Sequence, residues 1–297
     1  MELFATGFNA WRQLQFDNKR DNDNSDEPRD LSSFQSILKD DFIGCPCSLL
    51  SCTFVKTASA GIRNAGFMED ISERLKEKLL SSTAAVAWNG TVAEYDGHGT
   101  IRQYSSTGTR EQQSFSGLGN IAQLAAYETG FVALSHGGHV WTWGDERYSA
   151  CLGRPVTPSS PAERPGLVEE LEDLPTGKIK KISAAGYLVL ALTEGHDLYA
   201  WGGRPGQESV LEDISSSPTP VLVEESDIFD CGVGESHVIV LSSEGHVYVI
   251  GDNGNGQLGL PDSKVYSWTR VPLRLEAGQV VCGVEAGRST SFILAKY

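Results

Sequence analysis

Residues 254–259, Gly-Asn-Gly-Gln-Leu-Gly, have the spacing of a glycine loop that binds a dinucleotide. Such a loop holds a pyrophosphate because a helix N-terminus follows its last glycine. Here Leu260 and Pro261 follow, and no alternation of strands and helices surrounds the string. The stretch from Asp252 also fails as a calcium loop, because glycine occupies positions that need oxygen-bearing side chains. We therefore interpret it as a structural turn and expect no cofactor.

Cys45, Cys47 and Cys52 form the one cysteine cluster of the sequence, and three thiolates could contribute to a metal site. No fourth Cys or His stands nearby, although structural zinc usually has four ligands. In a strand, Cys45 and Cys47 face the same side, so burial as small apolar side chains explains them as well. We favour burial over a metal site, which stays the alternative.

The histidines do not form a pattern that indicates catalysis. Five of them stand at or beside turns that contain glycine: His98, His136, His139, His196 and His246. The sixth, His237, is expected to be a buried, hydrogen-bonded ring at the start of a strand. Nucleophile-elbow, phosphate-loop and zinc-protease motifs are absent from the sequence. We expect a protein that is not an enzyme.

Aromatic residues beside arginine are the best candidates for binding a partner protein, because such pairs are typical anchors of interfaces. Trp11 with Phe8 and Arg12 is expected to form one exposed patch, and residues 266–270 are expected to form another in a loop. Trp141, Trp143 and Trp201 alternate on strands and are expected to pack internally. The full set of candidates is Phe8, Trp11, Arg12, Asp145, Arg147, Tyr148, Asp252, Tyr266, Trp268 and Arg270.

These residues lie in a repeated pattern of a small-residue strand, a short turn, a β-rich strand and a glycine. Clear copies occupy residues 131–144, 189–202 and 238–251, and weaker ones occupy 91–104 and 51–65. The residues before the turns, Tyr95, Leu134, Leu192 and Leu241, are 39, 58 and 49 residues apart. This spacing is typical of four-stranded propeller blades of about 40 to 50 residues.

The two ends of the chain contain the two parts of one further unit. Residues 291–297 supply the first strand of the repeat, and the second strand that should follow is missing. Residues 3–14 supply such a second strand and the turn after it. Residues 7–14 and 251–258 also share Gly, Asn, Gln and Leu at the same offsets. We therefore predict that the terminal strands pair in one sheet and close a ring, which leaves no unpaired sheet edge. The prediction is a single all-β propeller domain over residues 1–297.

Three segments interrupt the repeats. Residues 17–33 are polar and charged and are expected to form a solvated or disordered loop. Within an insertion at 67–82, the spacing of Ile71, Leu75 and Leu79 predicts a short amphipathic helix near residues 69–80. Residues 105–119 are expected to be a connector.

Composition limits the classes of partner. The 297 residues carry a net charge of −15, which argues against nucleic acid or an anionic membrane as ligand and favours a basic or neutral protein. Six scattered cysteines and the lack of a long apolar run indicate a reducing compartment, cytoplasm or nucleus. We expect a monomer.

The repeated segments resemble the regulator of chromosome condensation repeat family, whose signature is Trp-Gly-x-Asn-x-x-Gly-Gln-Leu-Gly. The resemblance is carried by residues 251–259, 143–153 and 201–203, less strongly by 3–14, and faintly by 45–104. It implies a β-propeller closed by its terminal strands; the founding member has seven blades and six are recognisable here, so we expect six or seven.

The resemblance also implies several functions. A scaffold that binds a protein partner through loops on one face is the first. Guanine-nucleotide exchange on a small GTPase is the second. An adaptor in tRNA or diphthamide modification, bound to a subunit of the modification complex, and a chromatin reader that binds histones are further alternatives.

Overall fold

The computed structural model describes residues 1–16, 27–67, 71–105 and 113–297. These residues form six antiparallel sheets. The chain divides into two compact units, the first made of Met1–Lys76 with Phe229–Tyr297 and the second of Glu77–Ile228. We describe each unit by itself.

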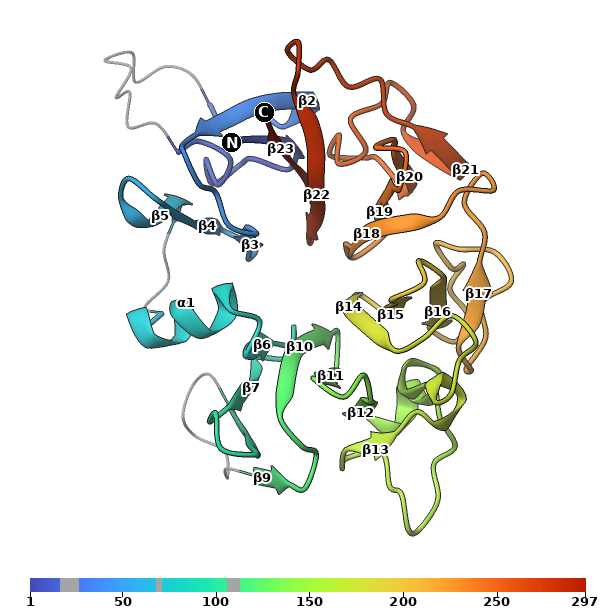
Figure 1. Cartoon of the computed structure of the whole chain (residues 1–297). Helices are drawn as coiled ribbons and strands as arrows, with labels where there is room; N and C mark the ends of the chain where they lie inside the picture. Colours follow the sequence, from blue (N-terminus) through green and yellow to red (C-terminus); the bar gives the residue numbers. More distant parts are fainter. Residues whose placement is uncertain (17–26, 68–70, 106–112) are drawn as a thin grey trace. The chain divides into compact units, whose positions relative to one another are not determined.

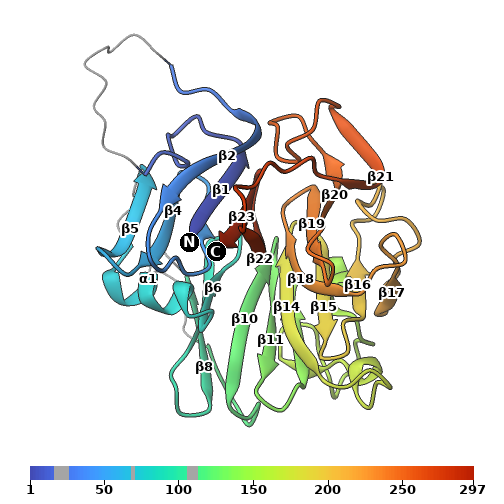
Figure 2. The same cartoon turned by 45° about the horizontal axis from the view of Figure 1, so that its top comes forward.

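One sheet of unit 1 is built from both ends of the chain. Its two inner strands are β1 (Glu2–Gly7) and β23 (Thr290–Lys296), which pair antiparallel. β2 (Leu31–Lys39) pairs with the other side of β1, and β22 (Val280–Gly287) with the other side of β23. Figures 1 and 2 show the N- and C-terminal strands beside each other in this sheet. The predicted pairing of the two chain ends is confirmed.

Two further sheets and a helix complete the description of unit 1. The four strands of one sheet, in spatial order, are β18 (Ile228–Val233), β19 (His237–Ser242), β20 (Val247–Asp252) and β21 (Lys264–Arg270). The other sheet has three strands, β3 (Cys47–Ser48), β4 (Cys52–Thr57) and β5 (Gly61–Gly66). The helix α1 (Glu73–Leu80) follows β5 in the chain and crosses the boundary between the units.

Unit 2 contains three four-stranded sheets, each with its strands in chain order. The first is β6 (Ala84–Val86), β7 (Thr91–Tyr95), β8 (Thr100–Ser105) and β9 (Gln113–Ser116). The second is β10 (Ile121–Tyr127), β11 (Gly130–Ser135), β12 (Val140–Gly144) and β13 (Gly166–Leu167). The third is β14 (Ile179–Ala185), β15 (Leu188–Thr193), β16 (Leu198–Gly202) and β17 (Thr219–Val221). Two 3₁₀ helices, η1 (Glu146–Leu152) and η2 (Glu169–Leu171), lie in the long connections.

The second strand of a sheet is the most apolar one because both of its faces are covered. β11, β15 and β19 are buried at every residue. A strand that is buried on both faces carries a continuous apolar run instead of an alternating one. By contrast, β2 and β9, at the end of their sheets, are largely exposed or half-buried. The strand patterns in the sequence therefore follow from the position of each strand in its sheet.

The predicted propeller fold of six blades is confirmed, because each sheet has its strands in the meander order of a blade. Five of the sheets have four strands, and β3, β4 and β5 form a sheet of three strands among the described residues. The predicted helix is present, but it begins at Glu73, and residues 69–70 of its expected range lie outside the described residues. The single domain over residues 1–297 stays a prediction.

Two segments expected to be irregular contain strands. Residues 31–33 of the polar loop predicted at 17–33 belong to β2, whereas residues 17–26 lie outside the described residues. The connector predicted at 105–119 contains β9, which pairs with β8 through Phe115 and its neighbours. Both strands are at the end of a sheet, where one face and one edge meet water, so polar residues are tolerated in them.

Candidate protein-interaction surface

The turn after β1 and the turn after β20 are built alike by a buried asparagine. Asn9 Oδ1 accepts a hydrogen bond from Leu14 N at 3.0 Å, and Asn253 Oδ1 accepts one from Leu258 N at 2.8 Å. Both leucines are buried, and Leu14 packs in the core beside residues of β1, β4 and β23. The side chain of each asparagine thus replaces backbone pairing inside a tight loop and fixes its path. This confirms that residues 254–259 form a structural turn.

A buried glutamine makes a second hydrogen bond within each of these turns. Gln13 Oε1 accepts from Trp11 N, and Gln257 Oε1 accepts from Asn255 N, both at 2.9 Å. The side-chain amide nitrogens of the two glutamines have different hydrogen-bond acceptors. Gln257 Nε2 donates to the Asp252 carboxylate at 3.0 Å, whereas Gln13 Nε2 donates to a carbonyl of another sheet, Leu50 O, at 3.3 Å. The turn after β1 is therefore anchored to the β3–β4 turn.

The two turns differ at two positions that lie between the asparagine and the glutamine. Trp11 occupies the position of Asn255, and Arg12 occupies the position of Gly256. Arg12 has φ of 58° and Gly256 has φ of 81°, so both adopt the left-handed conformation that the turn requires. That conformation costs an ordinary residue about 1–2 kcal/mol, and glycine avoids the cost. Arg12 is thus held, exposed, in a conformation that favours glycine.

Trp11 is part of a cluster of exposed apolar side chains. It is 49% exposed, and its ring centroid lies 6.3 Å from that of Phe67, which is 62% exposed. Phe67 follows β5, and its N–H donates to Ser51 O at 2.9 Å, which places it beside the β3–β4 turn and the exposed Leu50. We call Trp11, Arg12, Leu50 and Phe67 the turn surface.

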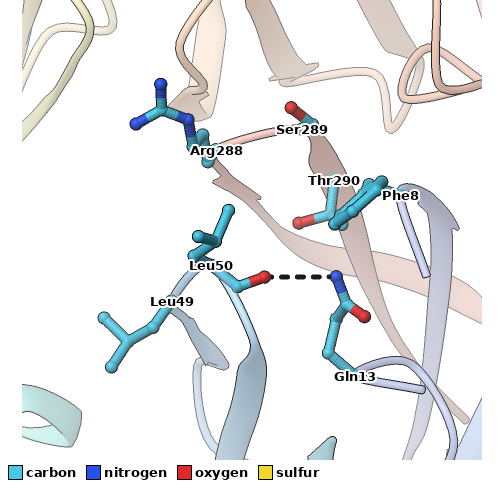
Figure 3. Close-up of a pocket in the computed structure, with 7 residues that line it drawn as sticks. All are labelled: Phe8, Gln13, Leu49, Leu50, Arg288, Ser289 and Thr290. Carbon is cyan, nitrogen blue, oxygen red and sulfur yellow. Dashed lines mark hydrogen bonds between the residues drawn. The ribbon is translucent and has the colours of Figure 1, made fainter. Parts of the chain in front are cut away.

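A small pocket adjoins the turn surface (Figure 3). Its walls come from the turns after β1 and β3 and from the β22–β23 turn: Phe8, Gln13, Leu49, Leu50, Arg288, Ser289 and Thr290. The hydrogen bond from Gln13 to Leu50 O links two of these lining residues. Arg288 Nη2 donates to Glu235 Oε1 at 2.6 Å, so this guanidinium belongs to an ion pair at the edge of the pocket. The pocket therefore combines apolar walls with a charged rim.

Asp252 and the aromatic residues after it have different surroundings from Trp11. The Asp252 carboxylate accepts from Gln257 Nε2 and from Gly254 N, so it stabilises its own turn. Residues 266–270 do not form a loop, as the sequence analysis expected, but belong to β21 and pair with β20. Their bulky and β-branched side chains favour a strand. Tyr266 is exposed under the Lys264 ammonium, with Trp268 and Arg270 further along the same strand.

In unit 2, Asp145, Arg147 and Tyr148 lie together at the start of η1. Asp145 caps this helix and accepts from Arg147 Nε at 3.0 Å, and these hydrogen bonds hold the pKa of the Asp145 carboxyl below its ordinary value. The Tyr148 ring lies 4.8 Å from that of Tyr187, and the Arg204 guanidinium lies 5.3 Å from the Tyr187 centroid. Nothing in the sequence pointed to Tyr187 or Arg204.

His237 and the cysteine cluster have different surroundings. His237 is fully buried, with Nε2 3.0 Å from Ser291 Oγ, as expected for a hydrogen-bonded ring. Cys45 is exposed and donates to Glu285 Oε2 at 3.1 Å, whereas Cys52 is buried. Within the described ranges, no three His, Cys, Asp or Glu side chains are grouped to hold a metal ion. No helix in the described part of the chain is long and apolar enough to span a membrane.

Leu50 and Phe67 of the turn surface were missed in the sequence. Each is a surface apolar residue in a turn, and surface residues of this kind are common. Hydrogen bonds of Gln13 and Ser51 help to bring them to Trp11. Asp30 was also missed; its carboxylate accepts from Asn9 N at 2.8 Å and from Asn255 Nδ2 at 3.0 Å and so joins the two turns.

Comparison with known proteins supports the family resemblance. Residues 244–294 match the regulator of chromosome condensation (RCC1) repeat. The mouse regulator of chromosome condensation is 30% identical over 146 residues, which cover 48% of this chain and 33% of that protein. The matched part therefore spans about a third of the length of this relative.

Solved structures share the fold over almost the whole chain. Human WBSCR16 has a TM-score of 0.60 at 17% identity, over 99% of this chain and 82% of that one. Prp20p of Saccharomyces cerevisiae, whose structure was described with its binding to Gsp1p and histones, has a TM-score of 0.59 at 15% identity, over 98% of this chain and 90% of that one. With this fold and the six meander sheets, the chain is a β-propeller, and its residues 244–294 match one regulator of chromosome condensation repeat.

Proposed function

We propose that the chain is a non-enzymatic scaffold that binds a partner protein through the turn surface of unit 1. The observation that carries this proposal is the exposed pair of Trp11 and Phe67, held 6.3 Å apart by two different sheets. Interfaces are enriched in aromatic residues and arginine, and their energy is concentrated in a few such anchors. Arg12 supplies the charged neighbour of the pair.

Rigid support is the second reason for choosing this surface. Asn9, Gln13 and Leu14 are buried, and their hydrogen bonds and packing fix the turn that carries Trp11 and Arg12. A side chain on a fixed turn loses less conformational freedom on binding than one on a mobile loop. The turn surface thus has the two properties of an anchor site, exposed aromatic area and little ordering cost.

The partner proposed here is a protein, in the cytoplasm or nucleus, and the chain acts as a monomer. The net charge of −15 attracts basic surfaces at long range. Arg12 contributes an exposed guanidinium-bearing side chain to the contact itself. The proposal therefore combines long-range attraction of a basic protein with an apolar contact at the turn.

Quantitative affinity purification from the native cell tests this proposal. The tagged wild-type chain is compared with Trp11→Ser, with Phe67→Ser and with the control Trp88→Ser. Trp88 is 51% exposed, close to the 49% of Trp11, but lies in the β6–β7 turn of unit 2. We expect at least one partner to fall about tenfold in both turn-surface variants, as for the loss of an interface anchor. The control should retain that partner.

Thermal melting of each variant separates lost binding from lost folding. Substitution of an exposed side chain usually changes stability by at most about 0.5 kcal/mol, so all three variants should melt close to the wild type. A set of partners that is the same for Trp11→Ser, Phe67→Ser and the wild type would refute the turn surface as the binding site.

Guanine-nucleotide exchange is the second candidate, because Prp20p, which shares this fold, was described with its binding to Gsp1p. Release of a fluorescent guanine nucleotide from a panel of purified small GTPases measures it directly. Acceleration above the intrinsic rate by the wild-type chain supports exchange, and its absence rejects exchange and leaves the scaffold. Histones are tested by pull-down at low and moderate salt, since binding by charge weakens as salt rises.

A further inference from the structure

Four side chains of unit 2 form a row that takes no part in the proposed function. The row begins with Arg147, whose guanidinium carbon lies 5.9 Å from the centroid of the Tyr148 ring. The Tyr148 and Tyr187 centroids are 4.8 Å apart, and the Arg204 guanidinium carbon lies over the Tyr187 ring at 5.3 Å. We call these four residues the arginine–tyrosine row. It has a guanidinium at each end and two aromatic rings between them.

Three turns from two sheets bring the row together. Tyr148 lies in η1 after β12, Tyr187 in the β14–β15 turn, and Arg204 after β16. Gly203 N donates to Tyr187 O at 2.8 Å, and Cys151 Sγ of η1 donates to the same carbonyl at 3.4 Å. Both tyrosine rings also pack against the core cluster that the two sheets share. The rings are therefore fixed in place by the fold, which lowers the ordering cost of binding.

The two arginines differ in what already binds them. Arg147 donates from Nε and Nη2 to the Asp145 carboxylate. Among the residues that the structure describes, Arg204 has no carboxylate partner, and its guanidinium contacts the face of the Tyr187 ring. Arginine presents a planar fork of donors that matches a carboxylate, and an aromatic face holds that fork by a cation–π contact. The Arg204 end of the row is therefore suited to an anionic ligand.

Tyr187 adds a donor and apolar area beside Arg204. Burial raises the pKa of Tyr187 to about 12, although the charge of Arg204 opposes the shift. The hydroxyl therefore stays protonated at neutral pH and is able to donate to an anion. Tyr148 and Tyr187 are half-buried and both arginines are exposed, so the row meets solvent. Tyrosine and arginine are the residue types that most often carry the binding energy of an interface.

We propose that the arginine–tyrosine row binds an acidic segment of a partner protein, with an Asp or Glu side chain on the Arg204 guanidinium and the apolar part of the segment against the two rings. The contact combines a bidentate, charge-assisted hydrogen bond with burial of aromatic surface. All four residues belong to unit 2, whereas the turn surface belongs to unit 1. The inference therefore does not rest on the proposed function.

The charge of the whole chain limits the size of the acidic segment. The net charge of −15 repels a large acidic protein, and Glu128, whose charge acts on Tyr187, adds to the repulsion. At physiological salt such repulsion is screened over about 8 Å. A short segment with few carboxylates is therefore a better occupant than a strongly acidic domain.

Selection from a random peptide library displayed on phage tests the proposal. The library is first depleted on the immobilised full chain carrying Arg204→Gln, which removes peptides that bind elsewhere, and is then selected on the wild-type chain. We expect the enriched peptides to contain Asp or Glu beside apolar residues. Enrichment of peptides without Asp or Glu, enrichment of basic peptides, or no enrichment overturns the proposal.

Fluorescence anisotropy with the most enriched peptide, labelled with fluorescein, measures the contribution of Arg204. Arg204→Gln should weaken binding about tenfold, as for the loss of an interface anchor. The matched control is Arg164→Gln, because Arg164 is another exposed arginine of unit 2. It should bind as the wild type does, and both variants should melt close to the wild type because both positions are exposed. Equal weakening by the two variants overturns the proposal.

Asp145→Asn should produce a gain of binding, which a damaged fold does not imitate. Asparagine caps a helix as well as aspartate, so η1 should be retained. Arg147 loses its carboxylate partner and becomes available to the peptide. We expect the acidic peptide to bind about threefold more tightly than it binds the wild type, the scale of one surface ion pair. Unchanged or weaker binding contradicts the proposal.

Trp11→Ser separates this outcome from that of the partner-capture experiment. The acidic peptide should bind this variant and the wild type equally, because Trp11 belongs to unit 1. Equal binding together with unchanged partners in Trp11→Ser rejects the turn surface and keeps the arginine–tyrosine row. Loss of peptide binding in Trp11→Ser places the peptide on the turn surface and rejects the row.

Discussion

Acidification between pH 7 and 5 should destabilise this protein through one buried histidine, His237. The ring is fully buried in unit 1, with Nε2 3.2 Å from Thr290 O and 3.0 Å from Ser291 Oγ. Since Thr290 O can only accept, the neutral ring carries its proton on Nε2. Nδ1 is buried against Gly234 and has no hydrogen-bond partner among the described residues. A second proton would therefore enter a site with no acceptor.

The pKa of His237 gives the size of the effect. Burial lowers it from 6.5 to about 4, although the Thr290 carbonyl and the charge of Asp252 oppose the shift. The unfolded chain therefore binds a proton more readily than the folded chain as the pH falls below about 6.5. Stability decreases from that pH down to about 4 and loses no more from this group below it. At about 1.4 kcal/mol per unit of pKa, the total loss is about 3 kcal/mol, of which about 2 kcal/mol falls between pH 7 and 5.

Urea unfolding of the wild type and of His237→Gln at pH 7, 6 and 5 measures this loss. The glutamine amide can still donate to Thr290 O, but it does not titrate. The variant should be less stable at pH 7, and its stability should fall by about 2 kcal/mol less than that of the wild type on going to pH 5. All other ionisable groups are shared, so the difference between the two curves reports His237.

A direct titration of the ring provides the second measurement. The Hε1 resonance of His237 should titrate with a midpoint near 4, or the protein should unfold before the ring ionises. Parallel stability curves for the wild type and His237→Gln, or a midpoint near 6.5 in the folded protein, would refute the reasoning.

Two further changes test the sheet of the chain ends and the turn that supports the surface. Leu3→Ala should lower the free energy of unfolding by about 2–5 kcal/mol, because Leu3 is fully buried in β1; Leu222→Ala, at an 85% exposed position, should change it by at most about 0.5 kcal/mol in the same urea titration. Gly256→Ala should cost more than about 2 kcal/mol, because its Cβ would lie 2.6 Å from Leu31 O at a φ of 81°. Gly97→Ala has a similar φ of 84° but open space around its Cβ, so it should cost only about 1 kcal/mol; equal melting temperatures of the two variants would contradict this.

The sequence predicted the features that depend on local patterns. The shared Gly, Asn, Gln and Leu of residues 7–14 and 251–258 predicted two equivalent turns, and the same side chains make equivalent hydrogen bonds in the structure. The unfinished unit at residues 291–297 predicted the pairing of β1 with β23. These predictions succeed because turn chemistry and strand alternation act over a few residues.

Strands at the ends of sheets are the hardest to predict from the sequence. β2 begins with Leu31 in a segment interpreted as a loop, β9 lies in a segment interpreted as a connector, and β21 holds residues 266–270 that were placed in a loop. An end strand has one neighbour and an open face, so its residues need not be apolar. The sheet of three strands that β3, β4 and β5 form among the described residues could not be predicted either, because pairing is set by the fold and not by local sequence.

The sequence predicts only two of the four residues of the turn surface, for a different reason. Trp11 and Arg12 stood out because they replace the small residues found at the same positions of the other turn, Asn255 and Gly256. Phe67 lies far along the chain and becomes a neighbour of Trp11 only when β5 pairs with β4. Contacts between sheets depend on tertiary structure, so no local sequence pattern predicts them.

The backbone conformation of Arg12 supports the proposal that the turn surface binds a partner. In the turn after β20, the left-handed position is filled by Gly256, which meets the backbone of β2 and leaves no space for a side chain. In the turn after β1, the same conformation is imposed on Arg12 by the bonds of Asn9 and Gln13 on either side. An exposed arginine there costs about 1–2 kcal/mol in backbone strain, and strained residues concentrate at functional sites. Because the surrounding turn would form as well around glycine, that cost is consistent with a guanidinium positioned next to Trp11 for a partner.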